Sequence, residues 1–224
     1  MNFRNLMSFH WKDYRRAALT LFSVLILVDL LQVVLWRFFP SMDTGDANNL
    51  FGINRVIILI FTVINVIVTA SITFPLMVGF SVTRRNFYAT TLLALVLFCI
   101  SAALVESLLF ELGKSVLPTL EMEVSSGKPF LTHWYVFTVS LLLVGLIALL
   151  ISSSFTRLGA SLGTLSVVAY IVILNLFANI MPSLDFIDEP GMVTLVSDTP
   201  LMLIVIALLG IVGWLLFRRA SVKV

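Results

Sequence analysis

Long apolar runs separated by short polar stretches dominate the pattern of the chain. Each run holds about 18 residues or more, the length that a helix rising about 1.5 Å per residue needs to cross a hydrocarbon core of about 30 Å. A helix also satisfies its own backbone hydrogen bonds in lipid, and the alternating pattern of a barrel strand is absent. The predicted fold class is therefore all-α, an integral membrane protein with six transmembrane helices. The predicted spans are Ala17–Phe39, Arg55–Phe80, Phe87–Leu112, Leu131–Ile151, Leu158–Met181 and Pro200–Phe217.

The first sixteen residues follow a different pattern. Apolar and aromatic side chains recur there at helical spacing, and basic residues occupy the rest of the turn. They are Phe3, Leu6, Met7, His10 and Tyr14 on one face, and Arg4, Lys12, Arg15 and Arg16 elsewhere. This favours an amphipathic N-terminal helix in the inner membrane interface over an ordinary basic flank that only sets topology. We therefore divide the chain into an amphipathic segment, residues 1–16, and one transmembrane domain, residues 17–224.

The distribution of charge predicts the orientation. Loops on the cytoplasmic side of a membrane carry an excess of Lys and Arg. Ten of the 14 basic residues lie before the first span, between spans two and three, between spans four and five, or after the last span. Nine of the 12 acidic residues lie in the opposite connections or at their helix ends. Both termini are therefore predicted to be cytoplasmic.

The composition agrees with a membrane protein and narrows the function. Hydrophobic residues make up 60% of the chain, charged residues 12%, and the mean hydropathy is +1.09, which lies outside the range of soluble domains. The lipid bilayer is the expected surrounding, and we expect no nucleic-acid partner. The single Cys99 allows no disulfide within the chain.

Motifs of common enzyme classes are missing. The chain has no phosphate-binding G-x-x-x-x-G-K-[ST] loop, no H-E-x-x-H and no G-x-S-x-G. Its two histidines, His10 and His133, are predicted on opposite membrane faces, so a histidine metal site within one chain is not expected. We expect neither a catalytic site nor a bound cofactor.

The connection between the second and third spans, residues 74–88, is the most informative segment. Pro75 should kink the end of the second span because it removes a helix hydrogen bond. Gly79 permits a break after it, and Ser81 or Thr83 can cap the next helix. The residues alone also fit a tight helical hairpin with two arginines that only set topology.

This segment resembles the first cytoplasmic loop of ABC-2-type permeases, the membrane subunits of many bacterial ABC exporters. In that family a similar order of Phe-Pro, Gly, Ser or Thr, paired Arg and Phe joins helices two and three. The resemblance implies a short coupling helix that docks on a separate cytosolic ABC ATPase, with ATP and Mg²⁺ bound by that partner. It also implies a bacterial cell membrane. The residues that would contact the ATPase or shape the loop are Gly79, Ser81, Thr83, Arg84, Arg85 and Phe87.

Polar side chains inside the predicted spans are candidates for a substrate pathway. They are Asp29, Gln32, Asn65, Glu106, Asn175 and Asn179. A carboxylate in the bilayer costs about 2.5–3.5 kcal/mol, so such residues usually face a bundle interior or a cavity. Asp29, which we place near the midplane, either attracts a cationic or amphipathic substrate or hydrogen-bonds a neighbouring helix. Glu106 either shares that role or reaches the outer interface.

Small residues suggest where a second permease subunit, identical or related, would pack. Gly159 and Gly163 open the fifth span, Gly210 and Gly213 lie in the sixth, and small residues let helices approach closely. We predict that the fifth span, with the second span as a further candidate, forms a seam between two subunits, and that its two asparagines face this seam or a cavity. The acidic outer connection Pro182–Thr199 either forms short re-entrant helices, as in the resembling family, or is a solvated loop.

The resulting hypothesis is the permease subunit of an ATP-driven exporter for an amphipathic or hydrophobic substrate. One alternative is the six-helix substrate-binding subunit of an energy-coupling-factor importer. Another is a non-transport membrane protein, such as an immunity protein.

Overall fold

A computed structural model describes residues 3–38, 47–116, 129–180 and 192–218, and every element in these ranges is helical. The elements are α1 (Phe3–Phe38), α2 (Ala47–Val68), the five-residue π-helix η1 (Thr69–Thr73), α3 (Phe74–Gly79), α4 (Arg84–Val116), α5 (Phe130–Ile180) and α6 (Met192–Arg218).

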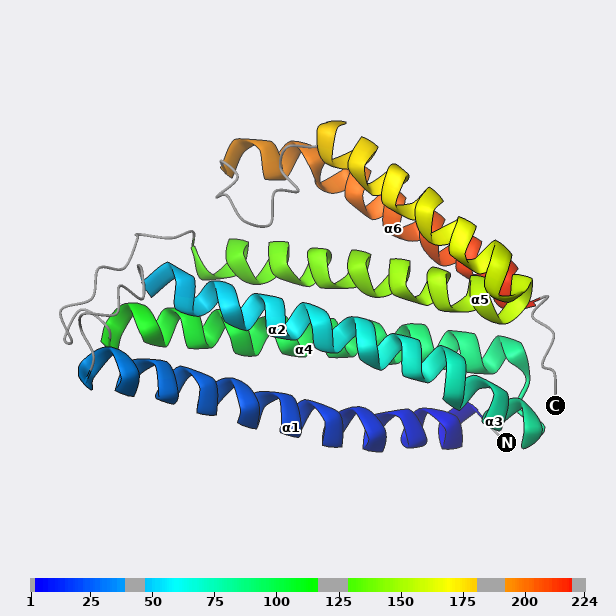
Figure 1. Ribbon diagram of the computed structural model, residues 1–224, viewed down its shortest axis with the longest axis horizontal. Coiled ribbons are helices and arrows are strands. Elements are labelled where there is room, and N and C mark those ends of the chain that lie inside the picture. Colours follow the sequence, from blue (N-terminus) through cyan, green and yellow to red (C-terminus); the bar gives the residue numbers. More distant parts are fainter. Residues whose placement is uncertain (1–2, 39–46, 117–128, 181–191, 219–224) are drawn as a thin grey trace.

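Four stretches of the described chain are long and apolar enough to cross a membrane. They are Arg4–Leu35, Ile53–Gly79, Arg84–Ser115 and Phe130–Arg157, and a shorter apolar helix follows at Met202–Arg218. The chain is therefore a multi-pass helical membrane protein. We call the end of the bundle that holds the 80–83 connection and the start of α1 the loop end, and the opposite end the far end (Figure 1).

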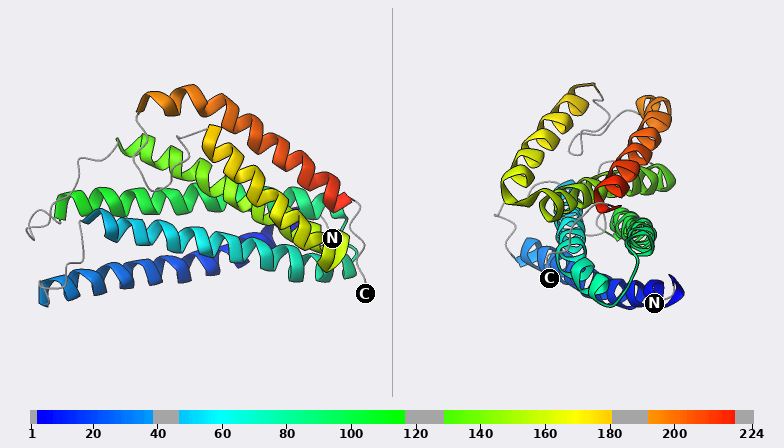
Figure 2. Two further views of the ribbon diagram at one scale, coloured as in Figure 1. Left: turned by 45° about the horizontal axis from the view of Figure 1, so that its top comes forward. Right: turned by 90° about the vertical axis from the view of Figure 1, so that its right-hand side faces the viewer.

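α5 consists of two arms that meet at a turn. Gly159 has φ 80° and ψ −179°, a conformation that glycine adopts without strain, and it interrupts the helix. Figures 1 and 2 show the second arm turning back on the side of the bundle away from α1, and the right-hand view of Figure 2 separates it from α6. The boundary expected between the spans Leu131–Ile151 and Leu158–Met181 is thus this turn at Gly159. α6 begins at Met192, so the connection expected at Pro182–Thr199 is helical in its second part, and residues 182–191 lie outside the described residues.

The N-terminal amphipathic segment is continuous with the first apolar span. The face expected to lie in the membrane interface is buried against protein at Leu6, His10 and Tyr14. The His10 ring lies 5.6 Å from the Phe87 ring, and the Tyr14 ring lies 5.7 Å from that of Phe98, both on α4. The periodicity was interpreted correctly as amphipathic, but the apolar face covers α4.

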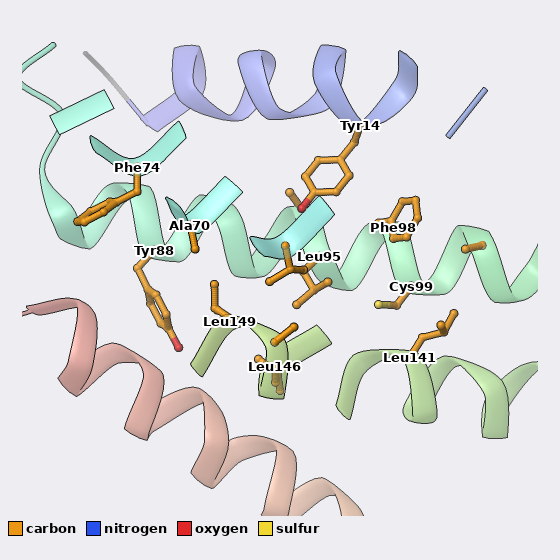
Figure 3. Close-up of a cluster of buried hydrophobic side chains, with 14 of the residues drawn as sticks. Tyr14, Ala70, Phe74, Tyr88, Leu95, Phe98, Cys99, Leu141, Leu146 and Leu149 are labelled. Atoms are coloured by element: carbon orange, nitrogen blue, oxygen red, sulfur yellow. The ribbon is translucent and has the colours of Figure 1, made fainter. Parts of the chain in front are cut away.

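The core of the bundle lies where the first arm of α5 meets α4 (Figure 3). Leu95 of α4 packs directly on Gly145 of α5, where an added Cβ would approach the Leu95 side chain to 2.9 Å. Figure 3 shows Leu141, Leu146 and Leu149 of the same arm directed toward this region, and all three are buried. The absent side chain at Gly145 therefore allows the two central helices to approach closely.

The side of α1 that faces away from the bundle is apolar. Leu27 is 66% exposed, Leu30 62% and Leu31 54%. In water such a stripe would be an unusual hydrophobic patch, whereas lipid tails cover it without cost. This arrangement agrees with a membrane-spanning α1.

A π-helical turn precedes Pro75. Proline has no N–H, and its ring clashes with the carbonyl four residues earlier in a regular α-helix. In η1 the wider hydrogen-bond pattern brings the N–H of Phe74 to the carbonyl of Thr69, five residues back. Pro75 then sits in the first turn of α3, where its missing N–H is tolerated. The interruption expected at this proline is therefore a π-turn.

An aromatic cluster joins four helices at the loop end. The ring of Phe74 lies 5.2 Å from that of Phe87 and 4.9 Å from that of Phe217 on α6. His10 of α1 packs on the other side of Phe87 at 5.6 Å. Phe74 and Phe217 are 1% exposed and Phe87 is 0% exposed, so the cluster excludes water. Aromatic pairs at these distances add about 0.5–1.5 kcal/mol each beyond area burial.

We predict that Phe87→Ala lowers the free energy of unfolding by about 3–5 kcal/mol, because it leaves a cavity among three aromatic rings. Thermal unfolding of the purified protein in detergent measures the effect. Phe80→Ala is the matched control, since Phe80 is 71% exposed on the neighbouring connection and its loss should change stability by less than about 0.5 kcal/mol. Equal destabilisation by the two variants would contradict the buried cluster.

Candidate functional site

A buried ion pair joins α2 to α4 near the far end. Nε of Arg55 donates to Oε1 of Glu106 at 3.0 Å, and the Glu106 side chain is fully buried whereas that of Arg55 is 31% exposed. Glu106 is therefore bonded to protein in the bundle interior and does not reach the interface as one alternative had it. A carboxylate in such a place requires a charged partner, because unpaired burial would cost several kcal/mol.

His133 of α5 completes this group. Arg55 also donates from Nη2 to Nε2 of His133 at 2.7 Å. Because a guanidinium only donates, we assign Nε2 as the unprotonated nitrogen and Nδ1 as the one that carries hydrogen. Nδ1 lies 2.9 Å from Oγ of Ser107 and 3.4 Å from Oε2 of Glu106, so it donates mainly to the hydroxyl.

This geometry argues against a serine hydrolase site. A catalytic histidine must accept the serine proton on one ring nitrogen while a carboxylate holds the other nitrogen. Here Ser107 and Glu106 both face Nδ1, which already carries hydrogen, and Arg55 occupies Nε2. The group is built as an electrostatic clamp between α2, α4 and α5.

An aromatic side chain supports the clamp. Phe110, one turn after Glu106, stacks on the His133 ring with centroids 4.8 Å apart and an interplanar angle of 17°. The Arg55 guanidinium lies 5.7 Å and the Lys114 ammonium 4.5 Å from the centre of the same ring, within the range of cation–π attraction. Lys114 also pairs with Glu111 at 3.2 Å on the exposed surface. We call Arg55, Glu106, Ser107, Phe110 and His133 the far-end clamp.

Asp29 of α1 is connected to the far-end clamp through Asn54, the neighbour of Arg55 on α2. Nδ2 of Asn54 donates to Oδ1 of Asp29 at 2.8 Å, and Asn54 directly precedes Arg55. Because Asn54 is the second residue of the apolar stretch Ile53–Gly79, Asp29 lies closer to the far end than the midplane position expected for it. Asp29 thus accepts a hydrogen bond from a neighbouring helix, which was one of the two roles expected for it.

The other predicted pathway residues do not join this group. Gln32 on α1 and Asn65 on α2 are half-buried, and the backbone carbonyl of Asn65 accepts from Thr69. Asn175 and Asn179 belong to the second arm of α5, and their side chains lie outside the described part of the structure. Within the described residues, no three His, Cys, Asp or Glu side chains gather as a metal site.

Sequence reasoning missed three members of the group: Asn54, Arg55 and His133. In the sequence, Arg55 stands at the end of a predicted span and His133 has no other histidine on its side of the membrane. Their depth was the available signal, because both lie within the first turns of predicted spans that begin on the same side as the end of the Glu106 helix. Opposite charges at one depth of neighbouring spans indicate a pair.

At the loop end, the 80–83 connection is a compact helix cap. Ser81 has a left-handed φ of 61°. The N–H of Ser81 donates to the carbonyl of Val78, and the N–H of Val82 donates to the carbonyl of Met77, each at 3.1 Å. This is a Schellman cap with a left-handed serine where glycine is usual, and buried Val82 and Met77 supply its hydrophobic contact. The expected break thus falls at Ser81, and Gly79 remains helical.

Thr83 caps the next helix, as one of the two expected alternatives had it. The Oγ1 atom of Thr83 accepts from the N–H of Asn86 at 3.4 Å, and the carbonyl of Thr83 accepts from the N–H of Phe87 at 3.0 Å. Phe80, Ser81 and Thr83 are exposed on the resulting surface. The connection therefore has a defined shape with a large apolar side chain at its tip.

The two arginines of the motif have different surroundings. Arg84 is half-buried and donates to the carbonyl of Arg218 at 3.2 Å, which ties the start of α4 to the end of α6. Arg85 is exposed. Phe87 is fully buried in the aromatic cluster, so of its two expected roles only loop shaping is compatible with its position.

The glycines proposed for a subunit seam make contacts within the chain. Gly159 forms the turn between the two arms of α5, and the Phe155 ring packs over Gly163 across that turn. On α6, Gly213 leaves room for the hydroxyl of Tyr88, which donates to the carbonyl of Gly210. These contacts account for close approach at Gly163 and Gly213 without a second subunit.

Comparison with protein families, curated proteins and solved structures finds no match for this chain. The site is therefore interpreted from its own residues.

We predict that Arg55→Met lowers the free energy of unfolding by about 3–5 kcal/mol, because it leaves the buried Glu106 carboxylate without its charged partner. Adding Glu106→Leu to Arg55→Met should recover most of this loss, since no uncompensated charge then remains. Lys114→Met tests an exposed pair on the same helix and should cost less than about 1 kcal/mol. Denaturant unfolding of these three variants and of the wild-type chain in micelles checks this, and a double variant no more stable than Arg55→Met would rule out the ion pair.

Proposed function

We propose that the chain is the permease subunit of an ATP-driven ABC exporter, with six spans and both termini in the cytoplasm of a bacterium. In this proposal the loop end is cytoplasmic and the far end is outside. A separate cytosolic ATPase binds and hydrolyses ATP with Mg²⁺, and a second permease subunit completes the pathway for an amphipathic or hydrophobic substrate.

The observation that carries the proposal is the exposed surface of the 80–83 connection. Phe80 is 71% exposed at the end where basic residues gather, and Ser81, Thr83 and Arg85 are exposed beside it. Positive charge around an exposed aromatic side chain in the aqueous phase is typical of a docking site for a protein. The Schellman cap fixes this surface before binding, which reduces the entropy lost on association.

The aromatic cluster connects such a docking surface mechanically to the helices of the bundle. Phe87 lies in the first turn of α4, directly after the connection, and its ring contacts those of Phe74, Phe217 and His10. Arg84 adds a link from the start of α4 to the end of α6. A push on the connection would therefore move α1, α3, α4 and α6 together, as a coupling element requires.

Labelling of single cysteines tests the proposed topology. Ser125→Cys, in the connection after the third span, should react with a membrane-impermeant maleimide in intact cells, and Ser221→Cys should react only in inverted vesicles. Cys99 is fully buried and serves as the unreactive internal control. Labelling of both new cysteines from the same side would contradict the three spans that the proposal places between them, and with them the proposed orientation of the C-terminus.

Charge reversal tests the proposed dock. Arg85→Glu should weaken co-purification with a separately encoded ATPase by about tenfold or more, because it reverses the charge that the exposed connection offers to a partner. Arg157→Glu makes the same change of charge at the cytoplasmic turn of α5 and should leave the complex intact. Phe80→Ala should weaken the complex without reducing thermal stability. Unchanged assembly and unchanged ATP hydrolysis in both Arg85→Glu and Phe80→Ala would exclude this surface as the coupling site.

A further inference from the structure

The polar layer at the far end carries an unbalanced charge. Among the described side chains it contains two carboxylates, Asp29 and Glu106, but one guanidinium, Arg55, and a histidine that is neutral while Nε2 accepts from Arg55. Lys114 and Glu111 cancel each other on the neighbouring surface. With both acids ionised, the layer has one net negative charge in an apolar bundle, where uncompensated charge is costly.

Two consecutive residues of α2 connect the carboxylates. Asn54 donates to Asp29 at 2.8 Å, and Arg55 donates to Glu106 at 3.0 Å. The acids of α1 and α4 therefore border the same turn of α2. The guanidinium compensates Glu106 directly, whereas the bond that Asp29 receives from the part of the chain described comes from an uncharged amide.

Two fully buried oxygen atoms in this layer accept no hydrogen bond from any described residue. The first is Oδ1 of Asn54, whose orientation is fixed because its amide nitrogen must face the acceptor-only carboxylate of Asp29. Oδ1 thus lies beside that carboxylate. The second is Oε2 of Glu106, which has only the distant His133 Nδ1 at 3.4 Å. Both residues are 0% exposed, so bulk water does not satisfy these atoms.

We propose that Asp29, Asn54 and Glu106 form a binding site for one monovalent cation. Carboxylate and amide oxygens are the ligands that hard cations prefer, and one positive charge brings the layer to neutrality. A divalent ion would reverse the imbalance next to Arg55. The ligand is either an alkali metal ion or the ammonium group of a small organic cation, since both supply a single positive charge to acceptor oxygens. The proposal does not depend on the exporter function.

Thermal unfolding of the purified full chain tests the site. At pH 8 and constant ionic strength, N-methylglucamine chloride is replaced by sodium chloride, potassium chloride or methylammonium chloride. A cation at ten times its Kd should raise Tm by about 3–6 °C, because it binds only the folded chain. A rise with sodium or potassium identifies a metal ion as the ligand, and a rise confined to methylammonium identifies an ammonium group.

Two variants localise the effect. Asp29→Asn keeps an oxygen that accepts from Asn54 but removes the charge, so it should abolish the rise in Tm. Glu111→Gln removes one negative charge from the same end of α4 without touching the layer, so it should preserve the rise. Should Asp29→Asn not fold, equilibrium binding of radioactive sodium or methylammonium to the wild-type chain and to Asn54→Leu replaces the comparison, and Asn54→Leu should bind at least tenfold more weakly.

Three results would overturn the proposal. The first is a wild-type Tm that is the same in all four salts. The second is an equal rise in Asp29→Asn, or equal binding by Asn54→Leu, which would place the cation elsewhere. The third is stabilisation by acidification alone, with no effect of any cation between pH 5 and pH 9, which would assign the compensating charge to a proton.

Discussion

A carboxylate held without water inside an apolar bundle constrains the relative positions of three helices. Glu106 on α4 needs a cation within hydrogen-bond distance, and Arg55 on α2 meets that need only where α2 begins beside the last turns of α4. The same guanidinium reaches His133 at the start of the first arm of α5. Apolar contacts alone would tolerate sliding of these helices, whereas the clamp fixes their depth because a shift of one turn would leave a buried charge unpaired.

The two ends of the bundle are held by different forces. At the far end the contacts are charged and directional, and they join α2, α4 and α5 with Asp29 of α1 beside them. At the loop end, rings from α1, α3, α4 and α6 pack in a water-excluding cluster around Phe87. Coulomb attraction falls slowly with distance, whereas a gap of about 0.5–1 Å already costs a dispersion contact a quarter to a half of its energy. The far end is therefore held by charge and the loop end by close packing.

The amino-acid pattern predicts much of this fold because lipid imposes a strong and simple constraint. Runs such as Phe87–Leu112 are helical with small errors at their ends, and the amphipathic face of Leu6, His10 and Tyr14 was identified from spacing alone. What covers that face was not predictable, since lipid and a neighbouring helix both accept apolar side chains.

Local signals near the candidate sites were harder to interpret. Gly79 predicts a break, yet the left-handed residue is Ser81, because the position of a cap depends on where Met77 and Val82 can be buried together. Glu106 and Asp29 were recognised as costly in lipid, but their partners Arg55 and Asn54 could be found only from the relative depth of separate spans. The exporter hypothesis itself depends on the 74–88 segment.

The π-turn before Pro75 also affects how this gene can vary. Relative to a regular helix, η1 contains one additional residue, and each residue advances the helix by about 100°. The wider turn takes up this additional residue, so the helix after it has nearly the rotation that a regular helix one residue shorter would give. Deleting one residue from Thr69–Thr73 should therefore restore α-helical hydrogen bonding and leave Phe74 in the aromatic cluster. A one-residue deletion elsewhere in α2 would instead turn everything after it by about 100°.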